Sequence, residues 1–200
     1  MLTVLGVLGG CCTAISLALS AIRLHFLILA VIGLLLNWLG DSLDGALARF
    51  RNCERPNFGY FIDHSADSFV AFVICLGAIF SQHFSHVMVM VNGGAYLLLI
   101  IVAILKHATT GVMKLSYSKL GPTEVRVVVG LLMLETYFFP HTQVTLIGIT
   151  LFPQDVFLAF CGVGQIVLFA CLVLKTKSEL AVIDSEPNSR TPVTELTSEY

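Results

Sequence analysis

Charge is scarce in this 200-residue sequence. Only 12% of its residues are Asp, Glu, Lys or Arg, whereas 56% are hydrophobic, and the mean hydropathy is +0.89. Soluble domains carry about 25% charged residues. Uncharged apolar runs recur along the chain, and a run of about 18 residues or more is long enough to cross a bilayer. The sequence therefore predicts an all-α integral membrane protein and excludes an ordinary soluble domain.

The sequence also lacks an excess of basic residues and cysteines at metal-binding or disulfide-like spacings. The net charge is −2, so the chain offers no basic surface for nucleic acid. Six cysteines occur, but none forms a CxxC or another zinc-like spacing, and five lie inside apolar runs, where cysteine behaves as a small hydrophobe. These absences exclude a nucleic-acid partner, a disulfide framework and a metal site built on thiols.

Six membrane-spanning helices are predicted from the apolar runs. They are expected at about residues 2–21, 24–50, 58–80, 87–105, 124–139 and 155–174. The first run has no basic segment before it, and the second follows almost at once, so we expect a retained span rather than a signal peptide. Residues 1–174 are thus expected to form one membrane domain, and residues 175–200 a polar, disordered tail.

The basic residues indicate how the chain is oriented. With six spans, the N-terminus and the tail lie on the same side of the membrane. Ten of the eleven Lys and Arg residues fall on that side, and only Arg23 falls on the other. Because cytoplasmic loops carry the excess of Lys and Arg, both termini are predicted to be cytoplasmic.

Four aspartates cluster between residues 41 and 67. Asp41 and Asp44 are three residues apart, and Asp63 and Asp67 are four apart, so each pair shares one face of a helix. The two helices are joined by a short loop, so the pairs can converge at the cytoplasmic interface. An aspartate deep in a membrane costs about 2.5–3.5 kcal/mol, so the cluster predicts a bound cation. Hard oxygen ligands without His or Cys favour Mg²⁺, Mn²⁺ or Ca²⁺ over zinc.

The residues beside the aspartates suit a nucleoside diphosphate. Gly45 directly follows Asp44, and Ala48 lies about one turn further on, so a base or phosphate can approach the helix backbone there. Arg49 can hold a phosphate through two hydrogen bonds. Gly59 leaves space on the facing helix, one turn before its aspartates. Together with the cation site, these residues indicate phosphoryl-transfer chemistry at a membrane surface.

The complete pattern resembles the signature of a known family. Asp41-x2-Asp44-Gly45-x2-Ala48-Arg49, nine further residues and then Gly59-x3-Asp63-x3-Asp67 is similar to the signature of the CDP-alcohol phosphatidyltransferases. All eight signature positions are occupied as that pattern requires. The resemblance implies the CDP-alcohol phosphotransferase fold, with six transmembrane helices and an active site at the cytoplasmic side.

The resemblance also implies an activity and a set of roles. Such an enzyme transfers a phosphatidyl or other substituted phosphoryl group from a CDP-alcohol, foremost CDP-diacylglycerol, to a small polar alcohol and releases CMP in phospholipid biosynthesis. It requires Mg²⁺ or Mn²⁺, here expected as two ions. The implied metal ligands are Asp41, Asp44, Asp63 and Asp67, with Asp67 also the catalytic base, and the implied CDP-binding residues are Gly45, Ala48, Arg49 and Gly59. A homodimer is implied as well, and the compact length favours a bacterial inner membrane.

Several alternatives stay open at this stage. Lys114, Lys119 and Arg126 can bind a phosphate on the acceptor, but the bias of basic residues toward the cytoplasm explains them equally well. The donor can instead be CDP-choline or CDP-ethanolamine, with diacylglycerol as the acceptor. A cation or proton transporter is the alternative of another class. It is disfavoured because its carboxylates would be spread over several depths of the membrane.

Overall fold

The all-helical prediction is confirmed in the computed structural model, which describes residues 2–53, 55–110, 122–140, 144–146 and 149–185. Its elements are α1 (Leu2–Ser20), α2 (Phe26–Phe50), α3 (Pro56–Ser81), α4 (His86–Thr110), α5 (Pro122–Phe138), β1 (Val144–Leu146), β2 (Ile149–Leu151) and α6 (Pro153–Ser185). The six helices lie where the apolar runs placed them. The short strands were not predicted; they pair antiparallel as a hairpin between α5 and α6.

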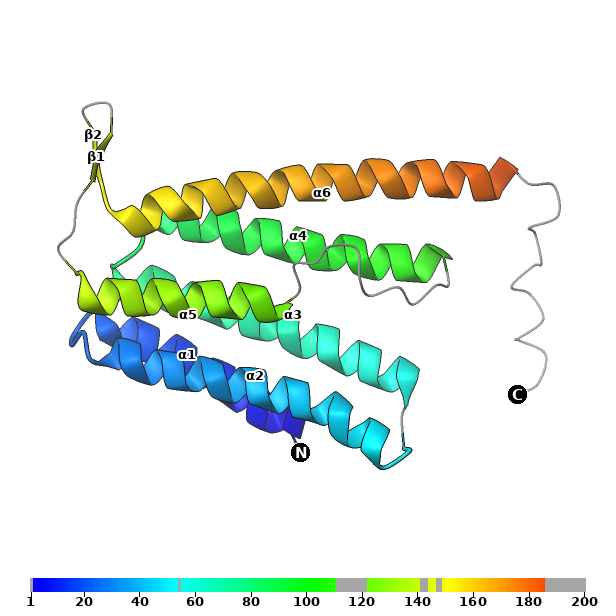
Figure 1. Ribbon diagram of the computed structural model, residues 1–200, viewed down its shortest axis with the longest axis horizontal. Helices are drawn as coiled ribbons and strands as arrows, with labels where there is room; N and C mark the ends of the chain where they lie inside the picture. Colours follow the sequence, from blue (N-terminus) through cyan, green and yellow to red (C-terminus); the bar gives the residue numbers. More distant parts are fainter. Residues whose placement is uncertain (1, 54, 111–121, 141–143, 147–148, 186–200) are drawn as a thin grey trace.

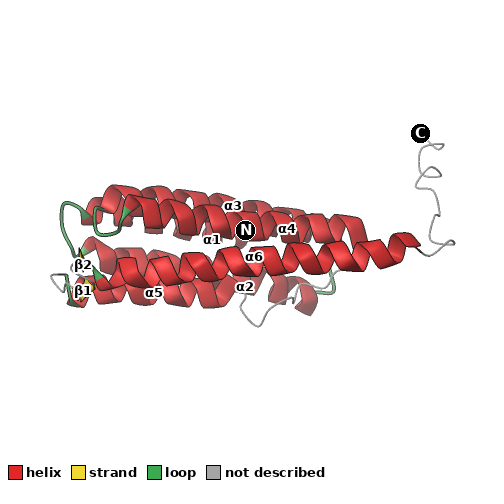
Figure 2. Ribbon diagram, turned by 90° about the horizontal axis from the view of Figure 1, so that it is seen from above, coloured by secondary structure: helices red, strands yellow, loops and turns green. Residues whose placement is uncertain are grey.

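The helices form two layers (Figure 2). One layer holds α1, α3 and α4, and the other holds α2, α5 and α6. The layers join where α1 packs on α2 and where α4 packs on α6. Successive helices run in opposite directions, so the start of α1 and the end of α6 face the same end of the bundle (Figure 1). The end of α2 and the starts of α3 and α5 face that end too.

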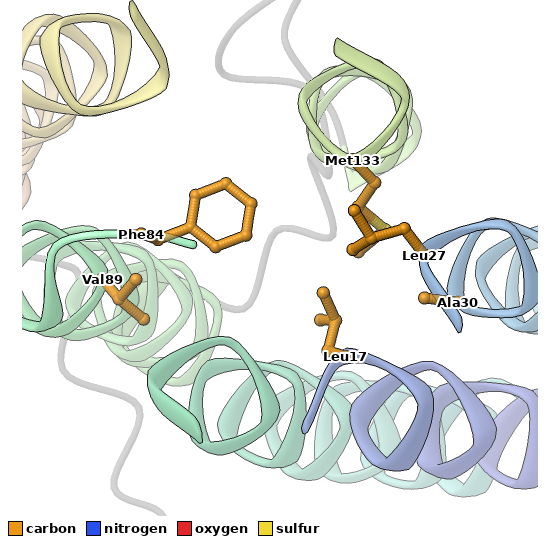
Figure 3. Packing of buried hydrophobic residues seen from close by; sticks show 6 residues of the cluster. All are labelled: Leu17, Leu27, Ala30, Phe84, Val89 and Met133. Carbon is orange, nitrogen blue, oxygen red and sulfur yellow. The ribbon is translucent and has the colours of Figure 1, made fainter. Parts of the chain in front are cut away.

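A hydrophobic core fills the opposite end of the bundle (Figure 3). It is formed by buried side chains from both layers: Leu17, Leu27, Ala30, Phe84, Val89 and Met133. These residues come from the end of α1, the start of α2, the α3–α4 turn, the start of α4 and the second half of α5. Packing of this kind fixes the helices relative to one another. The bundle is therefore held together away from the end that carries the aspartates.

Helices α1 and α2 cross with their backbones in contact. A Cβ atom added to Gly40 would lie 2.5 Å from the backbone nitrogen of Gly6, and one added to Gly9 would lie 2.5 Å from that of Asn37. Only glycine permits such an approach, because any side chain would push the helices apart. This close crossing lets polar side chains of one helix reach the other.

Five of the described helices are long and apolar enough to cross a membrane: α1, α2, α3, α4 and α6. Their outward-facing side chains are apolar, as at Phe160 and Val163 of α6, which are 79% and 63% exposed. Such surfaces suit contact with lipid. Helix α5, with 17 residues, is not among these five, so the sixth predicted span stays a prediction.

Helix α6 extends into the segment that was predicted to be a disordered tail. The sequence turns polar at Lys175, but α6 continues to Ser185, so the prediction of disorder is wrong for residues 175–185. Lys106 of α4 is only 3% exposed and donates a 2.5 Å hydrogen bond to Glu179, which ties the extension to α4. The rest of the predicted tail, residues 186–200, lies outside the described residues.

Candidate active site

Two consecutive helices carry the aspartate signature. Helix α2 bears its first pair near its C-terminal end, and the chain then turns through Asn52, which adopts a left-handed conformation at φ 49°. Asparagine tolerates this region better than most residues. Helix α3 begins at Pro56, as its position before an apolar run indicates, because the first residue of a helix needs no N–H donor. The turn returns the chain so that the second pair lies beside the first.

Three of the four aspartates meet around one small cavity. Asp41, Asp63 and Asp67 line it together with neighbours from α1 and α2, and its volume is about 10 Å³. This is room for about one water molecule. Asp63 also lies within electrostatic range of both Asp41 and Asp44. The predicted convergence of the two pairs is therefore what the helix arrangement produces.

Asp44 has a partner from the first helix. The hydroxyl of Thr3 donates a hydrogen bond to Oδ2 of Asp44. The contact spans 41 positions of sequence and is possible because α1 and α2 lie so close. It holds the Asp44 carboxylate at the α1 side of the cluster.

Arg126 of α5 joins the two aspartate pairs. Its Nη1 donates to Oδ2 of Asp41, and its Nη2 donates to Oδ1 of Asp67, both at 2.7 Å. The guanidinium side chain is 11% exposed, whereas those of Asp41 and Asp67 are 34% and 22% exposed. One cation from the second layer thus neutralises a carboxylate from each signature helix. The sequence indicated Arg126 only as a candidate for binding the acceptor phosphate.

The donor atoms of the cluster fit a divalent cation. Among the described residues, no three His, Cys, Asp or Glu side chains are already arranged as a set of ligands. The cavity nevertheless gathers three carboxylates, and Asn37, which also lines it, has a buried amide oxygen with no hydrogen-bond partner within the described ranges. A set made only of hard oxygens suits Mg²⁺ or Mn²⁺ and not zinc.

The predicted nucleotide-binding residues lie on the same ends of α2 and α3 as the aspartates. Gly45 is exposed, and a Cβ atom added to it would lie 3.5 Å from Nη1 of Arg49, so the guanidinium group lies over the glycine. Ala48 is half-buried on the same helix end. Gly59 faces open space as far as the described part of the chain is concerned, since none of its atoms comes within 4 Å of a Cβ added there. These four residues leave room for a ligand next to the carboxylates.

The structure adds residues that the signature does not contain. Thr3 of α1 donates a hydrogen bond to Asp44, Asn37 of α2 lines the same cavity as the aspartates, and Tyr96 of α4 lies within electrostatic range of Asp67 and Arg126. Asn37 stands one turn before Asp41, in the otherwise apolar first part of α2, so a polar residue at this spacing was a signal available in the sequence.

Two residues predicted to bind the acceptor phosphate cannot be placed. Lys114 and Lys119 lie outside the described residues, in the segment that connects α4 to α5. Arg126 follows that segment directly on α5, so it is the member of the predicted trio whose position is described.

Comparison with known proteins agrees with this geometry. The model of the CDP-alcohol phosphatidyltransferase family matches residues 1–174, which include all six helices up to the polar part of α6. No curated protein and no solved structure was found to match. The match covers most of the chain and includes the carboxylate cluster, so it does not depend on a short motif alone. The chain therefore belongs to the CDP-alcohol phosphatidyltransferase family, membrane enzymes of the transferase class that depend on divalent metal.

Proposed function

We propose that this enzyme transfers the phosphatidyl group of CDP-diacylglycerol to the hydroxyl group of a small polar alcohol and releases CMP. The observation that carries the proposal is the cluster of Asp41, Asp63 and Asp67 around one cavity, with Arg126 between two of them. A diphosphate brings further negative charge to this place, which Arg126, Arg49 and a divalent cation held by the carboxylates would compensate. The apolar helices let the lipid part of the donor stay in the bilayer.

Asp67 is the proposed base of the reaction. Its Oδ1 accepts from Arg126 in this structure and would face the cation when one is bound, so Oδ2 can take a proton from the acceptor hydroxyl. The acceptor oxygen then bonds to the phosphorus that carries the lipid, and the bond from that phosphorus to the oxygen bridging to CMP breaks. CMP leaves with the bridging oxygen. The lipid phosphodiester and CMP are the only products, and the proton rests on Asp67.

A divalent cation is proposed at the carboxylates of Asp41, Asp44, Asp63 and Asp67. When bound, it neutralises the diphosphate and stabilises the leaving CMP. Gly45, Ala48, Arg49 and Gly59 are proposed to hold the CDP group, because they lie on the helix ends that carry the aspartates, and Gly45 and Arg49 are exposed there. Arg49 can pair with a phosphate of the donor through its exposed guanidinium.

The position of Arg126 supports the proposal that the acceptor alcohol carries a negative charge. Its guanidinium and a divalent cation use oxygens of the same two carboxylates, Asp41 and Asp67. When a cation takes over these carboxylates, the guanidinium can turn to an anion instead, such as a phosphate group on the acceptor alcohol. We propose that the site faces the cytoplasm, in keeping with the distribution of basic residues, and that the membrane is a bacterial inner membrane.

The test uses purified protein in detergent micelles with CDP-diacylglycerol labelled in the cytidine. We expect CMP release that requires Mg²⁺ or Mn²⁺ and rises with one member of a panel containing serine, inositol, glycerol 3-phosphate and inositol phosphate. Asp67→Asn should abolish release, whereas Asp184→Asn, at the exposed end of α6, should not change it. CMP release from CDP-choline with diacylglycerol, and none from CDP-diacylglycerol, would overturn the choice of donor.

A further inference from the structure

The turn between α2 and α3 carries basic and aromatic side chains that are both exposed. Phe50, the last residue of α2, is 86% exposed, and Phe58, in the first turn of α3, is 61% exposed. Arg51 and Arg55 lie between them in the chain, and both are exposed. Within the described part of the chain, neither arginine forms an ion pair. We call these four residues the tip; their charges and rings are available to a partner outside the chain.

The end of α2 fixes the shape of this turn. The backbone N–H of Asn52 donates to the carbonyl oxygen of Arg49, and the N–H of Cys53 donates to that of Ala48. Asn52 takes the left-handed conformation that closes many helices at this position. The turn lies beyond the starts of α1 and α5 at the same end of the bundle (Figure 1). The tip is thus a defined projection from that end.

The lengths of the two helices place the tip in the headgroup layer of a bilayer. Helices α2 and α3 have 25 and 26 residues, which corresponds to about 37–39 Å at 1.5 Å per residue. At an average tilt of about 20° they extend about 35–37 Å across the membrane. The hydrocarbon core is about 30 Å thick, and each headgroup layer adds about 5–7 Å. The polar turns at His25 and Gln82 mark the opposite edge of the core, so the tip lies about 5–7 Å past the hydrocarbon.

The chemistry of the tip suits an anionic lipid. Residues 49–55 contain three arginines and one glutamate, a net charge of +2. A guanidinium group binds a phosphate through two parallel hydrogen bonds. Each basic residue at an anionic membrane surface strengthens association about fivefold, which corresponds to about 1 kcal/mol. The rings of Phe50 and Phe58 suit the boundary between headgroups and acyl chains. The orientation of the chain accounts for basic residues in general, but not for exposed rings at the same depth.

We propose that the tip binds anionic phospholipids of the surrounding leaflet. Arg51 and Arg55 hold headgroup phosphates, and Phe50 and Phe58 reach the start of the acyl chains. The lipid is a neighbour of the protein and not its substrate, so the inference goes beyond the proposed reaction and does not rest on it. Because the tip joins the two helices that carry the aspartates, this contact anchors the candidate active site at the membrane surface.

The test measures which lipid lies next to the turn. Full-length protein that retains only Cys53, an exposed residue of the turn, is labelled there with a fluorophore and placed in phosphatidylcholine nanodiscs. Phosphatidylglycerol or phosphatidylcholine with a nitroxide near the start of its acyl chain is then added as a quencher. We expect half-maximal quenching at a mole fraction of phosphatidylglycerol at least about fivefold lower than that of phosphatidylcholine. In the double variant Arg51→Gln and Arg55→Gln the two mole fractions should be equal.

The double variant Lys175→Gln and Lys177→Gln is the matched control. It removes the same charge from exposed positions of α6 at the same end of the bundle, and should keep the full preference for phosphatidylglycerol. Phe50→Ser tests the apolar part of the tip. Both lipids should then quench more weakly while the preference remains, because the turn lies farther from the acyl chains.

Three outcomes would contradict the inference. Equal quenching of the wild type by the two lipids would leave the arginines with a role in orientation only. Full preference in the double arginine variant would show that these arginines do not select the lipid. Loss of preference in the lysine control would assign it to the net charge of the protein. If the double arginine variant does not assemble, the single variants Arg51→Gln and Arg55→Gln decide, and full preference in both would refute the proposal.

Discussion

Replacing Arg126 with methionine should destabilise the metal-free protein and strengthen its response to divalent cations. The methionine side chain keeps much of the packing and removes the charge. Two charge-assisted hydrogen bonds of 2.7 Å, to Asp41 and Asp67, are lost. The substitution leaves two neighbouring carboxylates without their shared counter-charge, so they repel each other.

The size of the effect follows from the exposure of the partners. Breaking a fully buried ion pair costs about 3–5 kcal/mol. Here the carboxylates of Asp41 and Asp67 are 34% and 22% exposed, so water can solvate them in part. We therefore expect a loss of about 2–3 kcal/mol for Arg126→Met, close to the value of one strong hydrogen bond to a charged group.

Added Mn²⁺ should reverse this loss. A dication near a retained guanidinium is repelled by about 1 kcal/mol or more, so Arg126→Met should bind Mn²⁺ about tenfold more tightly than wild type. A cation at 100 times its dissociation constant then stabilises the fold by about 2.7 kcal/mol, enough to offset the substitution.

The assay is unfolding in detergent, first with chelator and then over a Mn²⁺ titration. Arg23→Gln, an exposed site in the turn between α1 and α2, controls for loss of a positive charge in general. Equal unfolding midpoints of Arg126→Met and wild type in chelator would refute the role of Arg126 as a counter-charge. Equal or weaker Mn²⁺ affinity in the variant would refute the competition for Asp41 and Asp67.

Three further predictions concern packing and orientation. Gly40→Val should separate α1 from α2 and cost about 1–3 kcal/mol in unfolding free energy, whereas Gly94→Ala, with open space around it, should cost nothing. Lys106→Met should lower the thermal unfolding midpoint because it removes the ion pair between the buried Lys106 ammonium and Glu179; an unchanged midpoint would contradict the role of this pair. A variant that retains only the exposed Cys53, in the α2–α3 turn, should react with an impermeant maleimide only after the cells are opened; labelling of intact cells would place the aspartates outside.

The sequence predicted the helices well because apolar run length is a local property. The limits of α1 to α4 follow from uncharged runs and from breakers such as Pro56. The end of α6 was missed because the polar residues after Lys175 form helix when Lys106 anchors them through Glu179, a contact 73 residues away in sequence. The hairpin was missed because its strands have only three residues each.

The candidate site was predictable only in part, because some of its contacts join residues that are far apart in the sequence. Spacings of three and four residues place each aspartate pair on one helix face, and the structure brings the pairs together. Nothing in the sequence joins Arg126 to Asp41 and Asp67, which lie 85 and 59 residues before it. Such contacts depend on how α5 packs against α2.

The most direct test of the account is the release of CMP from CDP-diacylglycerol by the purified wild-type enzyme and by Asp67→Asn, each with Mg²⁺ and with chelator. We expect release only from the wild type and only with the metal, because Asp67 takes the acceptor proton and the cation supports the leaving CMP. Equal release by Asp67→Asn, or undiminished release by wild type in chelator, would contradict the account.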